Sequence, residues 1–386
     1  MHTREMAFPA WSGLDMPAAN CNVITPSFPE PLSEEQLVKK IEHAVEMLAR
    51  QTLSAAQRIL IIVEDSSRPS RTAPVIETLL RVIAPRLPND VSFKMLFAGG
   101  AHYGLEEKNE FNKAPAKFPG PILTHNCLET SYYGDIDGKP VFLNREVDTA
   151  DLRISIGTVN IHPVSGYTGG AKILVPGVAG LRTIFCLHEL ERGSPGEAVT
   201  PMRRFITNVL EGHPIELGLQ LIANGKGEIV NLFVGPLQQA WDKAIEFLKP
   251  CVTRNIPELS NICIAEADPY DGNLLGIFKT LPVLIAAMTA NGHGVILIRA
   301  MEGLGHHHWR LESEVVNREK QRWEEQLAER RVTVITEALL DAAAWKHIFP
   351  MQLQAVQPGE IKIAKNKKAL VLKNAPLMLI KEKDSR

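Results

Sequence analysis

Three loops of this 386-residue sequence carry side chains that could do chemistry, and each follows a run typical of a buried strand. The first loop, 65–72, holds Asp65, Arg68 and several hydroxyl groups, which together suit a phosphate monoester. The second loop, 98–104, places His102 among glycines. On composition alone a capped surface turn explains the first loop equally well, and a lone loop histidine is more often structural than catalytic.

The third loop begins at Asn160 and is the most informative of the three. It supplies the candidates His162, Gly169, Gly170 and Lys172, and His188 follows it. A long glycine-rich loop is costly in conformational entropy, and such loops in compact domains usually have a function. Ile173 follows Lys172, so the phosphate-loop pattern G-x-x-x-x-G-K-[ST] is not met. No G-x-G-x-x-G follows the first strand either, which disfavours ordinary dinucleotide binding.

Alternating strand and helix patterns surround these loops. Ser33 begins a capping box before an apolar helical repeat, and a β-branched run at 59–63 predicts a buried strand. Further strands are expected at 91–97, 152–156, 229–234, 261–265, 295–299 and 332–335, and helices at 74–83, 201–223, 236–248, 277–290 and 312–329. This alternation predicts an α/β fold with largely parallel sheets. Ligands bind beyond the carboxyl ends of such strands, where the three loops lie.

Length and composition predict two α/β domains, 1–255 and 256–386, with the active site in the cleft between them. The stretch 369–381 is expected to be a strand that packs back on the first domain. The net charge of −2 argues against nucleic acid or an anionic membrane as a partner. No bilayer-spanning run or signal peptide is evident, and five scattered cysteines favour a reducing compartment, so a cytoplasmic location is expected.

Taken together, these motifs resemble the nickel-pincer nucleotide-dependent lactate racemase family of 2-hydroxyacid racemases and epimerases. The resemblance spans most of the chain and depends on the order and spacing of several weak motifs. Those motifs are Asp65-x-x-Arg68-Pro69, Gly100-x-His102, His162, the run Gly169-Gly170-Ala171-Lys172, Pro176-Gly177, His188, and a second-domain segment with Asp271 and Lys279.

The resemblance implies a nicotinate-derived mononucleotide whose two sulfur groups hold nickel. Lys172 matches the lysine that carries this group covalently, and His188 matches the protein ligand of nickel. Arg68, with Asp65 ordering its loop, would bind the phosphate, and Gly169 and Gly170 would let the backbone pass beside the ring. Other proteins must make and load the group, so a recombinant sample made without them is expected to be the apo form.

The resemblance also implies a reaction. One histidine takes the hydroxyl proton of a 2-hydroxyacid while the C2 hydride leaves, and the other histidine gives a proton when the hydride returns to the opposite face. His102 and His162 match this pair, and Lys279 matches a cation near the substrate oxygens. The family's glutamine is Gly276 here, which predicts free space and a substrate larger than lactate, for example a sugar acid.

Two other function classes stay open at this point. A zinc-dependent hydrolase or lyase could use His102, His162 and His188 as a three-histidine site, but this leaves the glycines around Lys172 unexplained. A non-enzymatic protein could hold an organic acid between two domains, but it would have no use for two opposed histidines. The run His306-His307-His308 is interpreted as an exposed polar turn. The oligomeric state is not predicted.

Overall fold

The computed structural model describes residues 8–48, 50–102, 113–303, 313–338, 342–361, 363 and 367–382. These residues divide into two compact units. The larger unit consists of Phe28–Pro250, and the smaller unit contains the described residues up to Ser27 and those from Cys251 onward. The predicted domain 1–255 therefore differs at its start, because Cys21–Ile24 pairs in parallel with Ala369–Leu372 of the smaller unit.

The larger unit is built on a six-stranded sheet in the order β11-β10-β7-β2-β3-β4. Its strands are β2 (Arg58–Glu64), β3 (Ser92–Ala98), β4 (Ile122–Thr124), β7 (Leu152–Thr158), β10 (Leu217–Ala223) and β11 (Ile229–Gly235). All neighbours from β10 to β4 pair in parallel, and only β11 runs antiparallel to its neighbour β10. The predicted α/β class with largely parallel sheets is confirmed.

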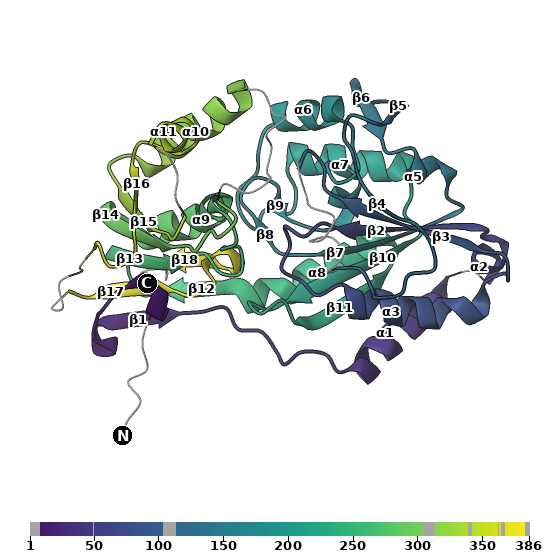
Figure 1. Ribbon diagram of the computed structural model, residues 1–386, viewed down its shortest axis with the longest axis horizontal. Helices are drawn as coiled ribbons and strands as arrows, with labels where there is room; N and C mark the ends of the chain where they lie inside the picture. The colour runs from purple at the N-terminus through teal and green to yellow at the C-terminus, as the bar shows by residue number, and fades with distance from the viewer. Residues whose placement is uncertain are drawn as a thin grey trace. The chain divides into compact units, whose positions relative to one another are not determined.

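Helices cover this sheet. They are α1 (Glu34–Met47), α2 (Arg50–Ala55), α3 (Ala73–Ile83), α5 (Glu146–Thr149), α6 (Leu181–Glu189), α7 (Pro201–Gly212) and α8 (Leu237–Val252), with 3-10 turns η3 (Ala84–Arg86) and η4 (Gly170–Ile173). The capping box forms at Ser33 as predicted, since its hydroxyl accepts from the backbone of Gln36 while the Gln36 side chain accepts from the Ser33 backbone. Alternate residues of the central strands pack against α1 and α3 in one apolar core. Figure 1 shows these two helices on one side of the sheet and α7 on the other.

Two hairpins complete the larger unit: β5 (Ser131–Ile136) with β6 (Lys139–Leu143), and β8 (Ile161–His162) with β9 (Gly166–Tyr167). The predicted helix over 201–223 is wrong in its second half, where α7 ends at Gly212 and β10 begins at Leu217. Pro214 and Gly218 disfavour a continued helix. All seven residues of β10 are buried between β7 and β11, so pairing in the sheet outweighs their helical periodicity.

The smaller unit has a six-stranded, wholly parallel sheet in the order β1-β17-β13-β14-β15-β16 and a separate parallel pair, β12-β18. Its strands are β1 (Cys21–Ile24), β12 (Thr253–Ile256), β13 (Ser260–Glu266), β14 (Met288–Leu297), β15 (Arg331–Ile335), β16 (Leu353–Val356), β17 (Ala369–Leu372) and β18 (Leu379–Glu382). Its helices are α9 (Ile277–Ala287), α10 (Ser313–Leu327) and α11 (Ala342–Ile348), with 3-10 turns η1 (Ala10–Ser12), η2 (Ala18–Asn20), η5 (Leu274–Gly276) and η6 (Ala375–Leu377).

The chain end forms two strands. The stretch 369–381 forms β17 and the start of β18; β17 pairs with β1 and β13, and β18 pairs with β12. These pairings lie within the smaller unit, although β1 and most of β12 belong to the predicted first domain, 1–255. Parallel pairing with β13 and β12 satisfies their backbone groups there. Within the described ranges, none of the helices combines the length and the apolar character that a bilayer crossing needs.

Candidate active site

The candidate residues of the larger unit gather after three neighbouring parallel strands, β7, β2 and β3. Asp65 directly follows β2, His102 lies in the turn after β3, and His162 lies in the β8–β9 hairpin after β7. Because the carboxyl ends of parallel strands meet at one edge of a sheet, segments distant in the sequence come together here. A backbone hydrogen bond of 2.8 Å from Gly100 to Gly177 further joins the His102 turn to the loop that follows Lys172.

His102 is paired with Asp65. Its Nδ1 is hydrogen-bonded to Asp65 Oδ2, and the two side chains are only 14% and 4% exposed. Burial by itself would raise the pKa of Asp65, but the charge of His102, the hydrogen bond with it and nearby Arg68 outweigh burial and hold the pKa well below its usual range. Asp65 is therefore an ionised carboxylate that fixes the orientation of the His102 ring.

The same carboxylate also organises the loop that follows β2. Asp65 Oδ1 accepts from the Ser67 backbone N–H at 3.2 Å and from the Ser67 hydroxyl. Arg68 Nη1 lies 3.4 Å from that hydroxyl, and the Arg68 side chain is half-buried. The predicted loop role of Asp65 is thus present in the geometry, together with a contact to His102 that the sequence did not suggest.

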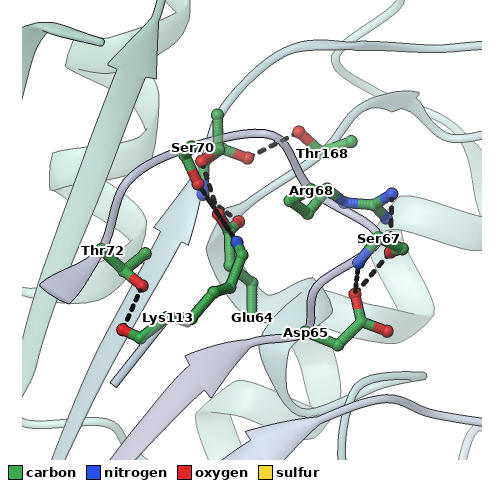
Figure 2. A network of polar contacts seen from close by, with 9 residues as sticks. Glu64, Asp65, Ser67, Arg68, Ser70, Thr72, Lys113 and Thr168 are labelled. Carbon is green, nitrogen blue, oxygen red and sulfur yellow. Dashed lines mark hydrogen bonds and ion pairs between the residues drawn. The ribbon is translucent and has the colours of Figure 1, made fainter. Parts of the chain in front are cut away.

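A buried polar network lies beside this loop (Figure 2). Glu64 accepts from the Ser70 hydroxyl, from Lys113 Nζ at 3.2 Å and from the Thr158 backbone at 2.6 Å. Burial by itself would raise the pKa of Glu64, but Lys113 and the hydrogen bonds outweigh it and lower the pKa. Thr158 in turn accepts through its carbonyl from the Thr168 hydroxyl at 2.6 Å. One network therefore joins the Arg68 loop to the loop that carries Lys172.

The His162 ring is held by the backbone that follows it. Its Nδ1 accepts from the N–H groups of Val164 and Ser165, at 3.2 and 3.1 Å. Two donors directed at Nδ1 leave that nitrogen unprotonated, so in the neutral ring the hydrogen is on Nε2. The neutral rings thus differ: His102 holds its hydrogen on Nδ1 toward Asp65, so its Nε2 is the acceptor nitrogen, whereas the Nε2 of His162 is a hydrogen-bond donor.

Lys172 extends from the 3-10 turn η4, and its Nζ donates to Ser165 Oγ at 2.9 Å. Gly169 and Gly170 have φ values of 71° and 60°, in the left-handed region. A Cβ on Gly170 would lie 2.8 Å from the Trp241 ring, and one on Gly169 would lie 2.8 Å from Gln220 Oε1. These glycines therefore make room for side chains of the protein itself, and the expected passage beside a cofactor ring is not needed to explain them.

The two remaining predicted residues lie on helices. His188 is in the last turn of α6, the helix that follows the Lys172 loop in the sequence. Lys279 belongs to the smaller unit, where its Nζ lies 4.3 Å from the centroid of the Tyr270 ring. Among the residues that the structure describes, no three histidine, cysteine or carboxylate side chains are grouped to hold a metal ion, so the three-histidine zinc site is not assembled. His306, His307 and His308 lie outside the described residues.

Gly276 corrects another expectation. The sequence predicted free space where the resembling family has a glutamine. A Cβ at Gly276 would lie 1.9 Å from the Tyr270 carbonyl oxygen and 3.2 Å from Ile298 Cδ1, so the protein itself fills this position. The glycine therefore gives no support to a larger substrate.

Comparison with known proteins agrees with this arrangement. A model of the lactate racemase N-terminal domain matches residues 13–200, which include Asp65, His102, His162, Lys172 and His188. The chain is 26% identical over 320 residues to lactate racemase of Thermoanaerobacterium thermosaccharolyticum, covering 74% of this chain and 71% of that protein. It is 24% identical over 304 residues to lactate racemase of Lactiplantibacillus plantarum, covering 71% and 68%. Residues 13–200 thus match the lactate racemase N-terminal domain, and the chain as a whole is similar to curated lactate racemases.

Solved structures show the same fold. The lactate racemase apoprotein of Thermoanaerobacterium thermosaccharolyticum superimposes with a TM-score of 0.74 at 20% identity, covering 95% of this chain and 96% of that one. A Thermotoga maritima protein gives a TM-score of 0.70 at 16% identity, covering 92% and 100%. The lactate racemase fold therefore extends over both units of the chain.

Sequence reasoning missed several residues around this candidate site. Glu64 could have been recognised in the sequence, because an acid that directly follows a fully apolar run is unusual. Arg203 could have been recognised as well, since it lies on the apolar face of α7 with Ile206 and Leu210. Lys113 and Gln220 offered no such signal, because only the folded chain brings them to Glu64 and to the Lys172 loop.

Proposed function

We propose that this chain is an isomerase that racemises or epimerises a 2-hydroxyacid. The observation that carries the proposal is the different hydrogen bonding of two imidazoles at one sheet edge: Nδ1 of His102 faces the Asp65 carboxylate, so its Nε2 is an acceptor, whereas Nδ1 of His162 accepts from two backbone N–H groups, so its Nε2 is a hydrogen-bond donor. A reaction that inverts a carbon bearing a hydroxyl group needs one group to take a proton and another to give one. Similarity to curated lactate racemases supports the same reaction class.

The side chains suit a nickel-pincer nucleotide. Lys172 offers a primary amine for covalent attachment, and His188 offers an imidazole, a ligand type that nickel accepts. Arg68 offers guanidinium donors for a phosphate. When bound, this group supplies hydride chemistry: it accepts the C2 hydride of the substrate and gives it back. Lys172, His188, Arg68 and Asp65 are thus proposed to serve the cofactor.

His102 is proposed as the base. Its Nδ1–H is directed at the ionised Asp65 carboxylate, which makes Nε2 the basic nitrogen of the ring and the one proposed to take the substrate hydroxyl proton. The imidazolium that forms is stabilised by the buried negative charge of Asp65, since an opposite charge at contact distance favours the charged form. Asp65 thus acts through His102, as a positioning residue.

His162 is proposed to act on the oxygen from the other side. Its Nε2–H donates a hydrogen bond to the oxygen of the 2-keto acid. To give a proton to that oxygen when the hydride returns to the opposite face, His162 must be the imidazolium, which is left as the neutral ring. Lys279 is proposed to stabilise negative charge on the substrate, a role that a cation suits. A small 2-hydroxyacid such as lactate remains the first substrate to test, because Gly276 gives no reason to prefer a larger one.

The decisive experiment is intact-protein mass spectrometry with metal analysis on the chain co-expressed with cofactor-synthesis proteins. We expect a mass increase that maps to Lys172 together with near-stoichiometric nickel. Lys172→Ala should abolish the mass increase, while His102→Ala and His162→Ala should keep it and lose interconversion in both directions. No mass increase and no nickel, in a host that loads a known family member, would refute the proposal.

A further inference from the structure

The loop that carries Lys172 rests on a buried guanidinium. Arg203 of α7 is 3% exposed, and it donates to the carbonyl oxygens of Tyr167 and, at 3.1 Å, of Gly169. Its guanidinium lies 4.3 Å from the centroid of the Trp241 ring. None of the ion pairs within the described part of the chain involves Arg203, and burial lowers its pKa to about 9. Keeping this charge buried is costly, and its contacts are with the loop backbone.

Two further buried side chains hold the same loop. Trp241 Nε1 donates to the Thr168 carbonyl at 2.9 Å, and Gln220 Oε1 accepts from the Gly170 N–H at 2.6 Å. Peptide groups of four consecutive residues, 167–170, are thus bound by side chains from α7, β10 and α8. Fixing two glycines is costly in backbone entropy, and these contacts offset the cost. The result is one defined conformation of the residues just before Lys172.

This arrangement reaches the Lys172 amine through Ser165. The Ser165 side chain is fully buried, and its hydroxyl donates to the Tyr167 carbonyl at 3.1 Å, the same oxygen that Arg203 binds. A hydroxyl has a single hydrogen, so the lone pairs of Ser165 Oγ are what Lys172 Nζ meets at 2.9 Å. Ser165 therefore accepts from the amine and orients it.

We propose that Ser165 and Arg203 are positioning residues that present the Lys172 amine for covalent attachment of the cofactor. The inference rests on the proposed function, in which Lys172 is the point of attachment. Ser165 has two separate roles in this arrangement: its hydroxyl accepts from Lys172, whereas its backbone N–H donates to His162. Replacing the side chain by alanine removes the first contact and leaves the second.

The test follows loading at Lys172 over time. The purified apo chain is mixed with the cofactor-synthesis proteins and their precursors, and the fraction of the Lys172 peptide with added mass is measured. Ser165→Ala should lower the initial loading rate about tenfold, the loss expected for one hydrogen bond to a charged group. Turnover per loaded molecule should fall less than loading does, because the N–H that holds His162 remains.

Arg203 variants test the other end of the arrangement. Arg203→Met should lower the loading rate at least as much as Ser165→Ala, and Arg203→Lys should recover part of it because a buried cation remains. Arg204→Met is the matched control, since Arg204 is the exposed neighbour on the same helix and should load like the wild type. If Arg203→Met does not fold, Ser165→Ala and Arg203→Lys still decide the question.

The outcomes separate the two proposals. Loading of Ser165→Ala and Arg203→Lys at the wild-type rate would overturn the positioning role while leaving Lys172 as the attachment point. Equal losses in loading and in turnover per loaded molecule would also overturn it, because that result indicates a general structural defect. A wild-type chain that gains no mass at Lys172 would overturn the proposed function and this inference with it.

Discussion

Replacing Asp65 by asparagine tests the asymmetry of the two histidines. Asp65 accepts from His102 Nδ1, from the Ser67 N–H and from the Ser67 hydroxyl, and its side chain is 4% exposed. An amide cannot accept at both ends. If its oxygen faces Ser67, its NH₂ group meets His102 Nδ1 and favours the hydrogen on Nε2, which removes the proposed base. If its oxygen faces His102, the NH₂ group meets the Ser67 N–H donor. In either orientation the substitution removes the negative charge that stabilises the His102 imidazolium.

The expected decrease in kcat of Asp65→Asn follows from these contacts. A hydrogen bond to a charged group contributes about 1.5–3 kcal/mol, so losing it from the transition state lowers kcat by roughly 10- to 100-fold. The assay is the initial rate of enantiomer interconversion in both directions, divided by the fraction of chains loaded at Lys172. Ser67→Ala is the control, because it removes another contact of Asp65 without touching His102 and should change kcat only a few-fold. A loaded Asp65→Asn enzyme with wild-type kcat would refute the orientation of His102 by Asp65.

Two further predictions concern stability. Lys113→Met should lower the free energy of unfolding by about 3–5 kcal/mol in denaturant titrations, because Glu64 then stays buried without its cation. Adding Glu64→Gln to the same chain should restore part of this loss. A loss below about 1 kcal/mol for Lys113→Met would contradict the prediction. Burial lowers the pKa of His125 to about 4, so the unfolded chain binds more protons than the folded one between pH 4 and about 6.5. Stability should therefore fall by about 3 kcal/mol as pH drops through this window; His125→Gln should flatten that dependence, and an unchanged slope would count against it.

Much of the larger unit could be predicted from local patterns. The apolar runs at 59–63 and 152–156 lie within β2 and β7, the run at 91–97 overlaps β3 apart from Val91, and the loops after these strands carry the candidate residues. Such runs are informative because a parallel strand buried on both faces must be continuously apolar. The same logic failed for β10, whose sequence continues the spacing of the preceding helix, so only its position between β7 and β11 decides its structure.

Other features depend on pairings that no local pattern contains. β1 joins β17 across most of the chain, so the boundary of the first domain could not be placed at Ser27 from composition. Lys113 resembles a surface lysine in the sequence, yet its side chain is buried against Glu64. Gly276 illustrates the converse, since an absent side chain suggested space that the backbone of Tyr270 fills. A glycine in the sequence indicates only that another group lies close to its Cα, and the folded structure identifies that group.

The end of β2 links the two imidazoles. Successive residues of a strand point to opposite sides, and Glu64 and Asp65 are successive acids at this point. Glu64 accepts from the Thr158 backbone at the end of β7, the strand that leads to His162, while Asp65 binds His102 beyond β3 on the other flank. The central strand thus supplies one carboxylate to each neighbour, and both are buried and held ionised by the groups around them. The sheet itself therefore sets the spacing between the two imidazoles, and this is the rigid support that the proposed proton transfers at the substrate oxygen require.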